Sequence, residues 1–254
     1  MILICGPCVI DTYGTLYNDA KVIKSIVDKY PSVDFYFKSS CIKDNRSNLK
    51  NYYGPGFEDG TRYLSMLKSE LGIKITTDFH TQEQIKEYGH TVDLIQIPAF
   101  LAMQTSLISE ASKVGKPIHI KKPQWLPPYD VSKPISKVLG QGGNIEVFIT
   151  DRGTTFGYGD VIFDPRHIKA MKDSSKCDKA LVDITHLQNH SKIYNRYYAE
   201  QVGAAAIAAG ADGLFIEATI DPDKAKCDAD SVLPIIVLEK YLEKFVKLYR
   251  FINE

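Results

Sequence analysis

The chain alternates short apolar runs, rich in β-branched residues, with longer segments in which apolar residues recur at helical spacing. Eight of the runs are predicted strands, at residues 2–5, 34–37, 73–76, 94–96, 117–120, 145–149, 180–183 and 213–216. Amphipathic helices are predicted between them, among others at 18–29, 60–71, 81–89, 102–114, 131–139 and 197–209. Regular alternation of strand and helix is typical of an α/β fold with a parallel sheet.

Eight strand-then-helix units in 254 residues predict a closed (β/α)8 barrel of the triosephosphate isomerase (TIM) type. The chain is 44% hydrophobic and has no Pro/Gly/Ser-rich linker, so we expect one domain over residues 1–254. The alternative is a doubly wound open sheet. That fold would call for a glycine-rich turn before the first helix, which Gly6-Pro7-Cys8 does not supply.

Charge and targeting signals narrow the class of protein. Lys plus Arg and Asp plus Glu both total 31, so the formal net charge is zero and implies neither a nucleic acid nor an anionic membrane as partner. The apolar start is short, lacks basic residues and breaks at Gly6-Pro7, unlike a signal peptide or a spanning helix. We therefore expect a cytoplasmic protein.

Cysteine usage agrees with that location. Five cysteines are an odd number, which favours free thiols or a metal ligand over a disulfide framework. Cys5 and Cys8 have the spacing of a redox pair, but Cys5 lies inside a predicted strand and no thioredoxin-like context follows.

Cationic side chains gather where the predicted strands end. In (β/α)8 barrels the reacting groups come from these carboxyl ends and from the loops that follow. Any one lysine at such a place could simply be solvated, but six cations around one mouth favour a substrate with several anionic groups. They are Lys38, Lys43, Arg46, Lys121, Lys122 and Arg152.

A second group combines one thiol, one imidazole and two carboxylates. Cys8, His186, Glu217 and Asp228 follow strands one, seven and eight, which become neighbours when the barrel closes. Mixed N, S and O ligands suit zinc, iron or manganese. Spacing alone is a weak signal, and by itself it favours a buried structural Cys8 and a hydrogen-bonded His186.

Ordered blocks of sequence run along nearly the whole chain. They include Gly6-Pro7-Cys8-Val9-Ile10, Lys43-Asp44-Asn45-Arg46-Ser47, Gln96-Ile97-Pro98, Lys121-Lys122-Pro123-Gln124, Asp151-Arg152-Gly153, Thr185-His186 and Cys227-Asp228. In these blocks the chain resembles the 3-deoxy-D-manno-octulosonate 8-phosphate synthase family. The resemblance independently implies the barrel.

The resemblance also implies an activity. In that family C3 of phosphoenolpyruvate attacks the aldehyde of arabinose 5-phosphate, water captures C2, and phosphate leaves by C–O cleavage. By similarity, Lys43, Lys122 and Arg152 would hold phosphoenolpyruvate, and Lys38 and Gln96 would line its pocket. Asn45, Arg46 and Ser47 would meet the aldose phosphate, and Asp228 or His80 would assist proton transfer.

Metal dependence follows from the same comparison. Family members with Cys in the Gly-Pro-Cys block need a divalent ion, and those with Asn do not. Cys8, His186, Glu217 and Asp228 therefore place this chain with the metal-dependent class. The resemblance further implies a homotetramer and a role in lipopolysaccharide biosynthesis.

Several positions depart from the family pattern. Met103 replaces an Arg that reaches the aldose phosphate across a subunit contact, Tyr53 replaces another Arg, and Thr219-Ile220 replaces His-Pro. These changes fall on the acceptor side, where Lys192 or Arg196 would have to compensate. Two alternatives stay open: a sister synthase that uses erythrose 4-phosphate or an unphosphorylated sugar, and a non-catalytic relative.

Overall fold

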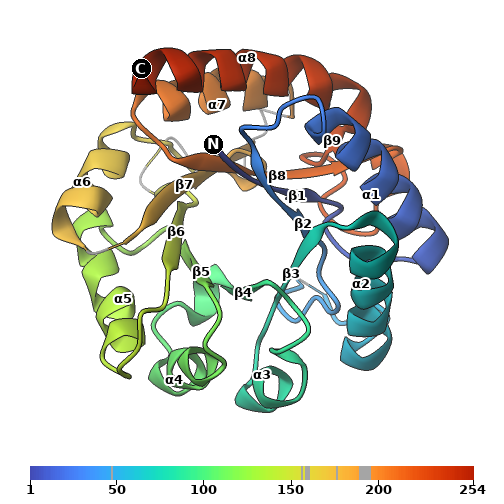
Figure 1. Cartoon of the computed structure of the whole chain (residues 1–254), viewed down its shortest axis with the longest axis horizontal. Coiled ribbons are helices and arrows are strands. Elements are labelled where there is room, and N and C mark those ends of the chain that lie inside the picture. The colour runs from blue at the N-terminus through green and yellow to red at the C-terminus, as the bar shows by residue number, and fades with distance from the viewer. Residues whose placement is uncertain (47, 156, 158–160, 176, 189–195) are drawn as a thin grey trace.

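A computed structural model describes residues 1–46, 48–155, 157, 161–175, 177–188 and 196–254. Eight parallel strands are hydrogen-bonded in sequence order, and the first also pairs with the eighth, which closes the barrel (Figure 1). They are β1 (Ile2–Gly6), β2 (Asp34–Lys38), β3 (Lys74–Asp78), β4 (Leu94–Ile97), β5 (Ile118–Lys122), β6 (Val147–Asp151), β7 (Lys179–Asp183) and β8 (Gly213–Thr219). The predicted (β/α)8 barrel is confirmed.

Eight α-helices surround the barrel (Figure 1). They are α1 (Tyr13–Val27), α2 (Phe57–Leu71), α3 (Gln82–Tyr88), α4 (Thr105–Lys113), α5 (Ser132–Leu139), α6 (Arg166–Ser174), α7 (Ala199–Ala208) and α8 (Ile235–Asn253). Short 3-10 turns η1 (Ala99–Leu101), η2 (Pro128–Val131), η3 (His186–Gln188), η4 (Arg196–Tyr198) and η5 (Pro222–Lys224), and a two-residue strand β9 (Leu233–Pro234), occupy the connections.

Helix boundaries differ from the predicted ones where local capping decides them. Helix α1 begins at Tyr13, five residues before the predicted start, because Thr12 and Thr15 form a reciprocal capping box. Helix α4 begins at Thr105 instead of residue 102, since residues 99–101 form the separate turn η1. Hydrophobic periodicity locates the buried face of a helix but does not fix its ends.

The strands run further toward their carboxyl ends than the apolar runs indicate. Strands β3, β5 and β6 each end two residues beyond the prediction, and β8 ends three residues beyond it. The added residues are largely polar because the barrel interior is polar at this end. Lys38, Lys121, Lys122 and Glu217 therefore lie in strands and not, as the sequence suggested, in the loops that follow.

The interior of the barrel has an apolar floor beneath this polar end. The floor consists of Ile2, Ile4, Tyr36, Leu94, Phe148, Leu181 and Phe215, a cluster separate from the larger core between strands and helices. Successive side chains of a strand point to opposite faces, so six of the eight strands supply residues both to this floor and to the larger core. The floor makes the barrel a packed core that opens toward the carboxyl ends of the strands.

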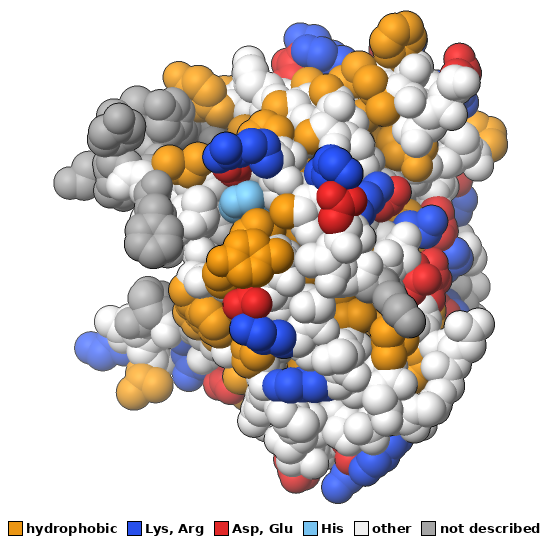
Figure 2. Space-filling view, turned by 90° about the vertical axis from the view of Figure 1, so that its left-hand side faces the viewer, with side chains coloured by type: hydrophobic (Ala, Val, Ile, Leu, Met, Phe, Trp, Pro, Cys, Tyr) orange, Lys and Arg blue, Asp and Glu red, His pale blue; other side chains and the backbone are white. Residues whose placement is uncertain are grey.

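The outer surface carries charges of both signs. On the face formed by α5 and α6, Lys and Arg side chains are interspersed with Asp and Glu side chains (Figure 2), in keeping with the formal charge of zero. Among the described residues no helix has the length and apolar character needed to cross a membrane. The five cysteines are free thiols, so Cys5 and Cys8 do not form a disulfide.

Candidate active site

A cavity of about 610 Å³ lies at the carboxyl end of the barrel. Five of the six predicted cations line it, and Lys122 does not. Several other predicted site residues share the lining. Together they are Lys38, Lys43, Asn45, Arg46, Gln96, Lys121, Arg152, His186, Glu217 and Asp228.

The two neighbouring lysines of β5 point in opposite directions. Lys121 faces the barrel interior, where it pairs with Asp183 and lies 3.4 Å from the centre of the Phe215 ring. Lys122 points outward, and its fully buried ammonium lies 3.2 Å from Asp151. The period of two along a strand therefore assigns the cavity to Lys121, which corrects the expectation that Lys122 reaches it.

Buried charges inside the cavity are paired. Lys38 donates to Glu217 at 2.9 Å, and both side chains are almost completely buried. Burial raises the pKa of Glu217, but Lys38, His186 and Lys43 outweigh this effect and bring it to about 2. Burial lowers the pKa of Lys121 to about 8, despite its partner Asp183. Glu217 is thus ionised at neutral pH.

Lys43 lies in the loop after β2, among anionic partners. Burial lowers the pKa of its ammonium, but Cys8, Glu217 and Asp78 raise it well above the usual range. Lys43 therefore remains a cation at the cavity wall.

The four predicted metal ligands lie in two overlapping groups. Cys8, Cys227 and Asp228 form one, His186, Glu217 and Asp228 form the other, and ligand atoms within each group lie within 4.8 Å of one another. The thiols of Cys8 and Cys227 lie 3.1 and 3.0 Å from the same Asp228 oxygen, Oδ2. Cys227 is a candidate ligand that the sequence reasoning did not assign.

The donor set fits a divalent cation. His186 Nδ1 lies 2.8 Å from Asp183 Oδ2, which leaves Nε2 directed toward Glu217 Oε2 at 3.8 Å. Within the described residues this buried Oε2 has no hydrogen-bond partner. A carboxylate behind a ligating histidine is the usual outer shell of a metal site, and Asp183, at the end of β7, supplies it. The sequence reasoning missed Asp183.

Asn45 and Arg46, from the loop after β2, also line the cavity. Arg46 donates to the Lys43 carbonyl at 2.8 Å and lies over the ring of Tyr53, 4.7 Å from its centre. Tyr53, one of the positions that depart from the family pattern, thus supports the Arg46 guanidinium. Ser47 lies outside the described residues.

His80 does not line the cavity. Its Nε2 lies 3.5 Å from Asp78 Oδ2, and Asp78 does reach the cavity. Burial opposes ionisation of Asp78, yet His80, Lys38 and Lys43 hold its pKa well below the usual range. His80 can therefore influence a molecule in the cavity only through its contact with Asp78.

Neither Met103, which stands at the position of the missing arginine, nor Arg196, one of its suggested replacements, lines the cavity. Met103 packs against the hydrophobic core, and its carbonyl accepts from Lys137 at 2.6 Å. Arg196 donates to the Ala229 carbonyl at 2.5 Å and so holds the loop after β8. Lys192 lies outside the described residues.

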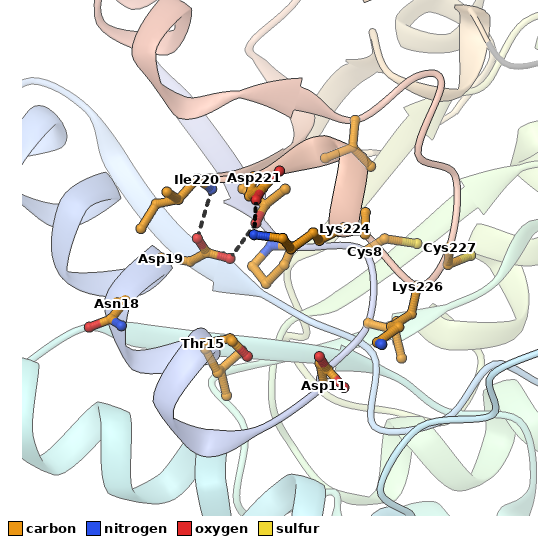
Figure 3. Close-up of a pocket in the computed structure, with 16 residues that line it drawn as sticks. Cys8, Asp11, Thr15, Asn18, Asp19, Ile220, Asp221, Lys224, Lys226 and Cys227 are labelled. Atoms are coloured by element: carbon orange, nitrogen blue, oxygen red, sulfur yellow. Dashed lines mark hydrogen bonds and ion pairs between the residues drawn. The ribbon is translucent and has the colours of Figure 1, made fainter.

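A second cavity, of about 450 Å³, lies between α1 and the loop after β8 (Figure 3). Lys226 and Cys227 border both cavities. In the second one Asp19 accepts hydrogen bonds from the Thr219 hydroxyl at 2.8 Å and the Ile220 amide at 2.9 Å. These bonds fix Thr219-Ile220, another departure from the family pattern, against α1.

Comparison with known proteins identifies the family of this chain. The pattern that defines the DAHP synthetase I family matches residues 1–254. A 2-dehydro-3-deoxyphosphooctonate aldolase of Syntrophobacter fumaroxidans is 36% identical over 258 residues, covering 99% of this chain and 88% of that protein. Proteins of the same name from Desulfatibacillum aliphaticivorans and Protochlamydia amoebophila are each 37% identical, over 98% and 100% of this chain and 92% and 93% of their own lengths. The chain belongs to the DAHP synthetase I family.

Proposed function

We propose that this protein condenses phosphoenolpyruvate with arabinose 5-phosphate, giving 3-deoxy-D-manno-octulosonate 8-phosphate and phosphate, and that residues 1–254 form one synthase domain. The observation that carries the proposal is the convergence of six cations on one cavity, the five predicted ones and Lys226, in a chain of zero net charge. Two phosphorylated reactants require such a concentration of positive charge. The name shared by the similar proteins agrees with this substrate pair.

Three cations are assigned to phosphoenolpyruvate: Lys43, Lys121 and Arg152, with Lys38 and Gln96 lining the same pocket. Lys121 takes the role that the sequence suggested for Lys122, because only Lys121 faces the cavity. Holding both reactants in attack geometry contributes about 7–11 kcal/mol to lowering a bimolecular barrier. Lys43, at the centre of the anionic side chains, is the residue we assign to neutralising charge during the reaction.

The acceptor is assigned to Asn45, Arg46 and Ser47 on the loop after β2. C3 of the enol pyruvate attacks the aldehyde carbon, water adds at C2, and the C–O bond to phosphate breaks. Asp228 borders the cavity and His80 does not, so we assign the accompanying proton transfer to Asp228.

Cys8, His186, Glu217 and Asp228 are the residues that would hold a divalent ion. Glu217 Oε2, which accepts no hydrogen bond from any described residue, and the orientation of His186 by Asp183 support this assignment. When bound, zinc, iron or manganese would supply Lewis-acid polarisation. Burial raises the pKa of the Cys8 thiol well above its usual range, and a coordinated cation favours the thiolate.

A sister synthase with another aldose is the second candidate. The observation that favours it is Met103, whose partly buried side chain packs against the core at the position where the resemblance implies a phosphate-binding Arg. One lost charge-assisted contact weakens phosphate binding by about 1.5–3 kcal/mol. That difference is enough to change the preferred acceptor.

The proposed assembly is a homotetramer. Three aromatic side chains in the connections after β4 and β5, Phe100, Trp125 and Tyr129, are each more than half exposed, and exposed aromatic residues are enriched in subunit contacts. Light scattering of the purified protein measures the subunit number. A monomer at every concentration tested would contradict the assembly.

Phosphate release from phosphoenolpyruvate tests the reaction. We expect turnover with added zinc, manganese or iron and arabinose 5-phosphate, and loss of turnover after chelation of the metal. The same assay with erythrose 4-phosphate, ribose 5-phosphate and unphosphorylated arabinose tests the acceptor. A preferred aldose other than arabinose 5-phosphate would establish the sister synthase, and no turnover with any aldose would indicate a non-catalytic relative.

The affinity for phosphoenolpyruvate should depend on pH through Lys121. Its pKa of about 8 means that the ammonium is charged below pH 8 and loses its charge as the pH rises. We therefore expect the KM for phosphoenolpyruvate to increase from pH 7 to pH 9. In Lys121→Met the KM for phosphoenolpyruvate should already be raised at pH 7. It should then no longer increase between pH 7 and pH 9. An unchanged profile in the variant would show that another group titrates.

A further inference from the structure

A buried charged network lies outside the barrel interior, between the outer face of β5 and β6 and helix α6. It consists of Lys122, Asp151 and His167. Lys122 and Asp151 are fully buried, whereas the His167 side chain keeps 12% of its surface exposed. None of the three lines either described cavity.

The Lys122 ammonium ties two loops together. Besides Asp151, it contacts the carbonyl oxygens of Pro123 at 3.1 Å and Leu126 at 3.3 Å, in the loop after β5. It also donates to the Gly153 carbonyl at 2.9 Å, in the loop after β6. One buried cation thus fixes the backbone of both loops at the positions where they leave the sheet.

The residues enclosed by these contacts face the cavity. Gln124 lies between Pro123 and Leu126, Arg152 lies between Asp151 and Gly153, and both line the cavity. Asp151 Oδ1 also accepts from the Gly153 amide at 3.0 Å, so the residues on both sides of Arg152 are held.

Gly153 is itself confined. Its φ of +80° favours glycine, and an added Cβ would lie 2.4 Å from a Val161 methyl carbon. The backbone at Arg152 therefore has little freedom to move.

His167 connects the network to α6. Its Nδ1 lies 3.0 Å from Asp151 Oδ2, which gives both carboxylate oxygens a partner. Burial raises the pKa of Asp151, but His167 and Lys122 together lower it below the usual value. Asp151 is therefore a carboxylate at neutral pH, and it lies 3.2 Å from the Lys122 ammonium inside the sheet–helix layer.

Burying an ion pair this deeply costs desolvation free energy. The desolvation of two charges is offset only when geometry is good and hydrogen bonds are satisfied, and apolar residues of similar volume often stabilise as well or better. The Lys122–Asp151 pair has a specific geometric effect, because it fixes the loops after β5 and β6 relative to each other. We propose that Lys122, with Asp151 and His167, positions Arg152 and Gln124 for phosphoenolpyruvate, an inference that rests on the proposed function.

The test is a double-mutant cycle between Lys122→Met and Arg152→Ala. In the native background we expect Lys122→Met to raise the KM for phosphoenolpyruvate by about tenfold and to leave the KM for the aldose within about twofold. In the Arg152→Ala background the same change should raise the KM for phosphoenolpyruvate by clearly less than about tenfold, because only the contribution through Gln124 is left. Trp125 is the single tryptophan and lies in the loop after β5 that Lys122 holds. Its fluorescence emission should therefore shift in Lys122→Met.

The outcomes distinguish the positioning role of Lys122 from the binding role of Arg152. Equal effects of Lys122→Met in both backgrounds would overturn the inference and leave the proposed function standing. If Arg152→Ala alone left the KM for phosphoenolpyruvate unchanged, Arg152 would not hold this substrate, and both its assigned role and the inference would fall.

Removal of one partner from a buried pair is strongly destabilising, so two further variants keep the test usable. Lys122→Met/Asp151→Asn leaves no unpaired charge and should show the same selective rise in KM. His167→Ala acts at the partly exposed end of the network, and His167→Asn, whose amide nitrogen can replace Nδ1, should restore the native KM. Equal KM values for His167→Ala and the native protein would count against the network.

Discussion

Replacing Glu217 with Gln is expected to weaken divalent-metal binding by more than about 100-fold, because even changes in the outer shell of a metal site cost 10–100-fold. Turnover should fall with the metal content. The change also leaves the Lys38 ammonium, now 2.9 Å from a neutral amide, buried without its counter-ion. We expect a loss of about 3–5 kcal/mol in the free energy of unfolding, measured by urea denaturation, together with metal analysis of the purified protein.

Glu110→Gln is the matched control. Glu110 is also buried, on α4, and pairs with Lys113 at 3.0 Å away from the cavity. Its replacement should leave metal content and turnover unchanged. Full metal content in Glu217→Gln would remove this carboxylate from the proposed ligand set.

Gly213→Ala is expected to cost more than about 4 kcal/mol of stability, which places it among the most damaging single substitutions. Gly213 lies opposite Ile2 at the β1–β8 seam that closes the barrel. An added Cβ would lie 2.2 Å from the Ile2 carbonyl oxygen, a backbone atom held in the sheet. Relief of this contact requires the two strands to separate, so the urea midpoint should fall steeply.

Gly14→Ala provides the comparison. Gly14 lies in the first turn of α1, and the nearest heavy atom to its added Cβ is 4.0 Å away. Alanine there should raise stability by about 0.5–1 kcal/mol, because glycine is the poorer helix residue. If both variants had the native midpoint, the seam would be less tightly closed than its geometry indicates.

The barrel could be predicted because eight apolar runs and the helices between them follow from periodicity alone. The convergence of Cys8, His186, Glu217 and Asp228 also followed, since β1, β7 and β8 become neighbours once the sheet closes. Topology brings residues together even when their spacing along the chain carries little signal.

The choice between Lys121 and Lys122 could not be made in the same way. It depends on which residues of β5 face inward, and the apolar run ends before either lysine. Extending the alternation from the inward-facing His119, which lies 2.6 Å from Thr150, would have given the right assignment. Asp183 and Cys227 were missed because their contacts with His186 and Asp228 are seen only when the side chains are in place.

The division of the cavity lining between strands and loops also affects which of its residues can change during evolution. Lys38, Gln96 and Lys121 belong to the hydrogen-bonded sheet, whereas Asn45 and Arg46 sit on a connecting loop. Loops accept substitutions and insertions at little thermodynamic cost, and a closed sheet does not. The cavity can therefore change most readily through its loop residues, while the side chains that the strands contribute to it are harder to replace.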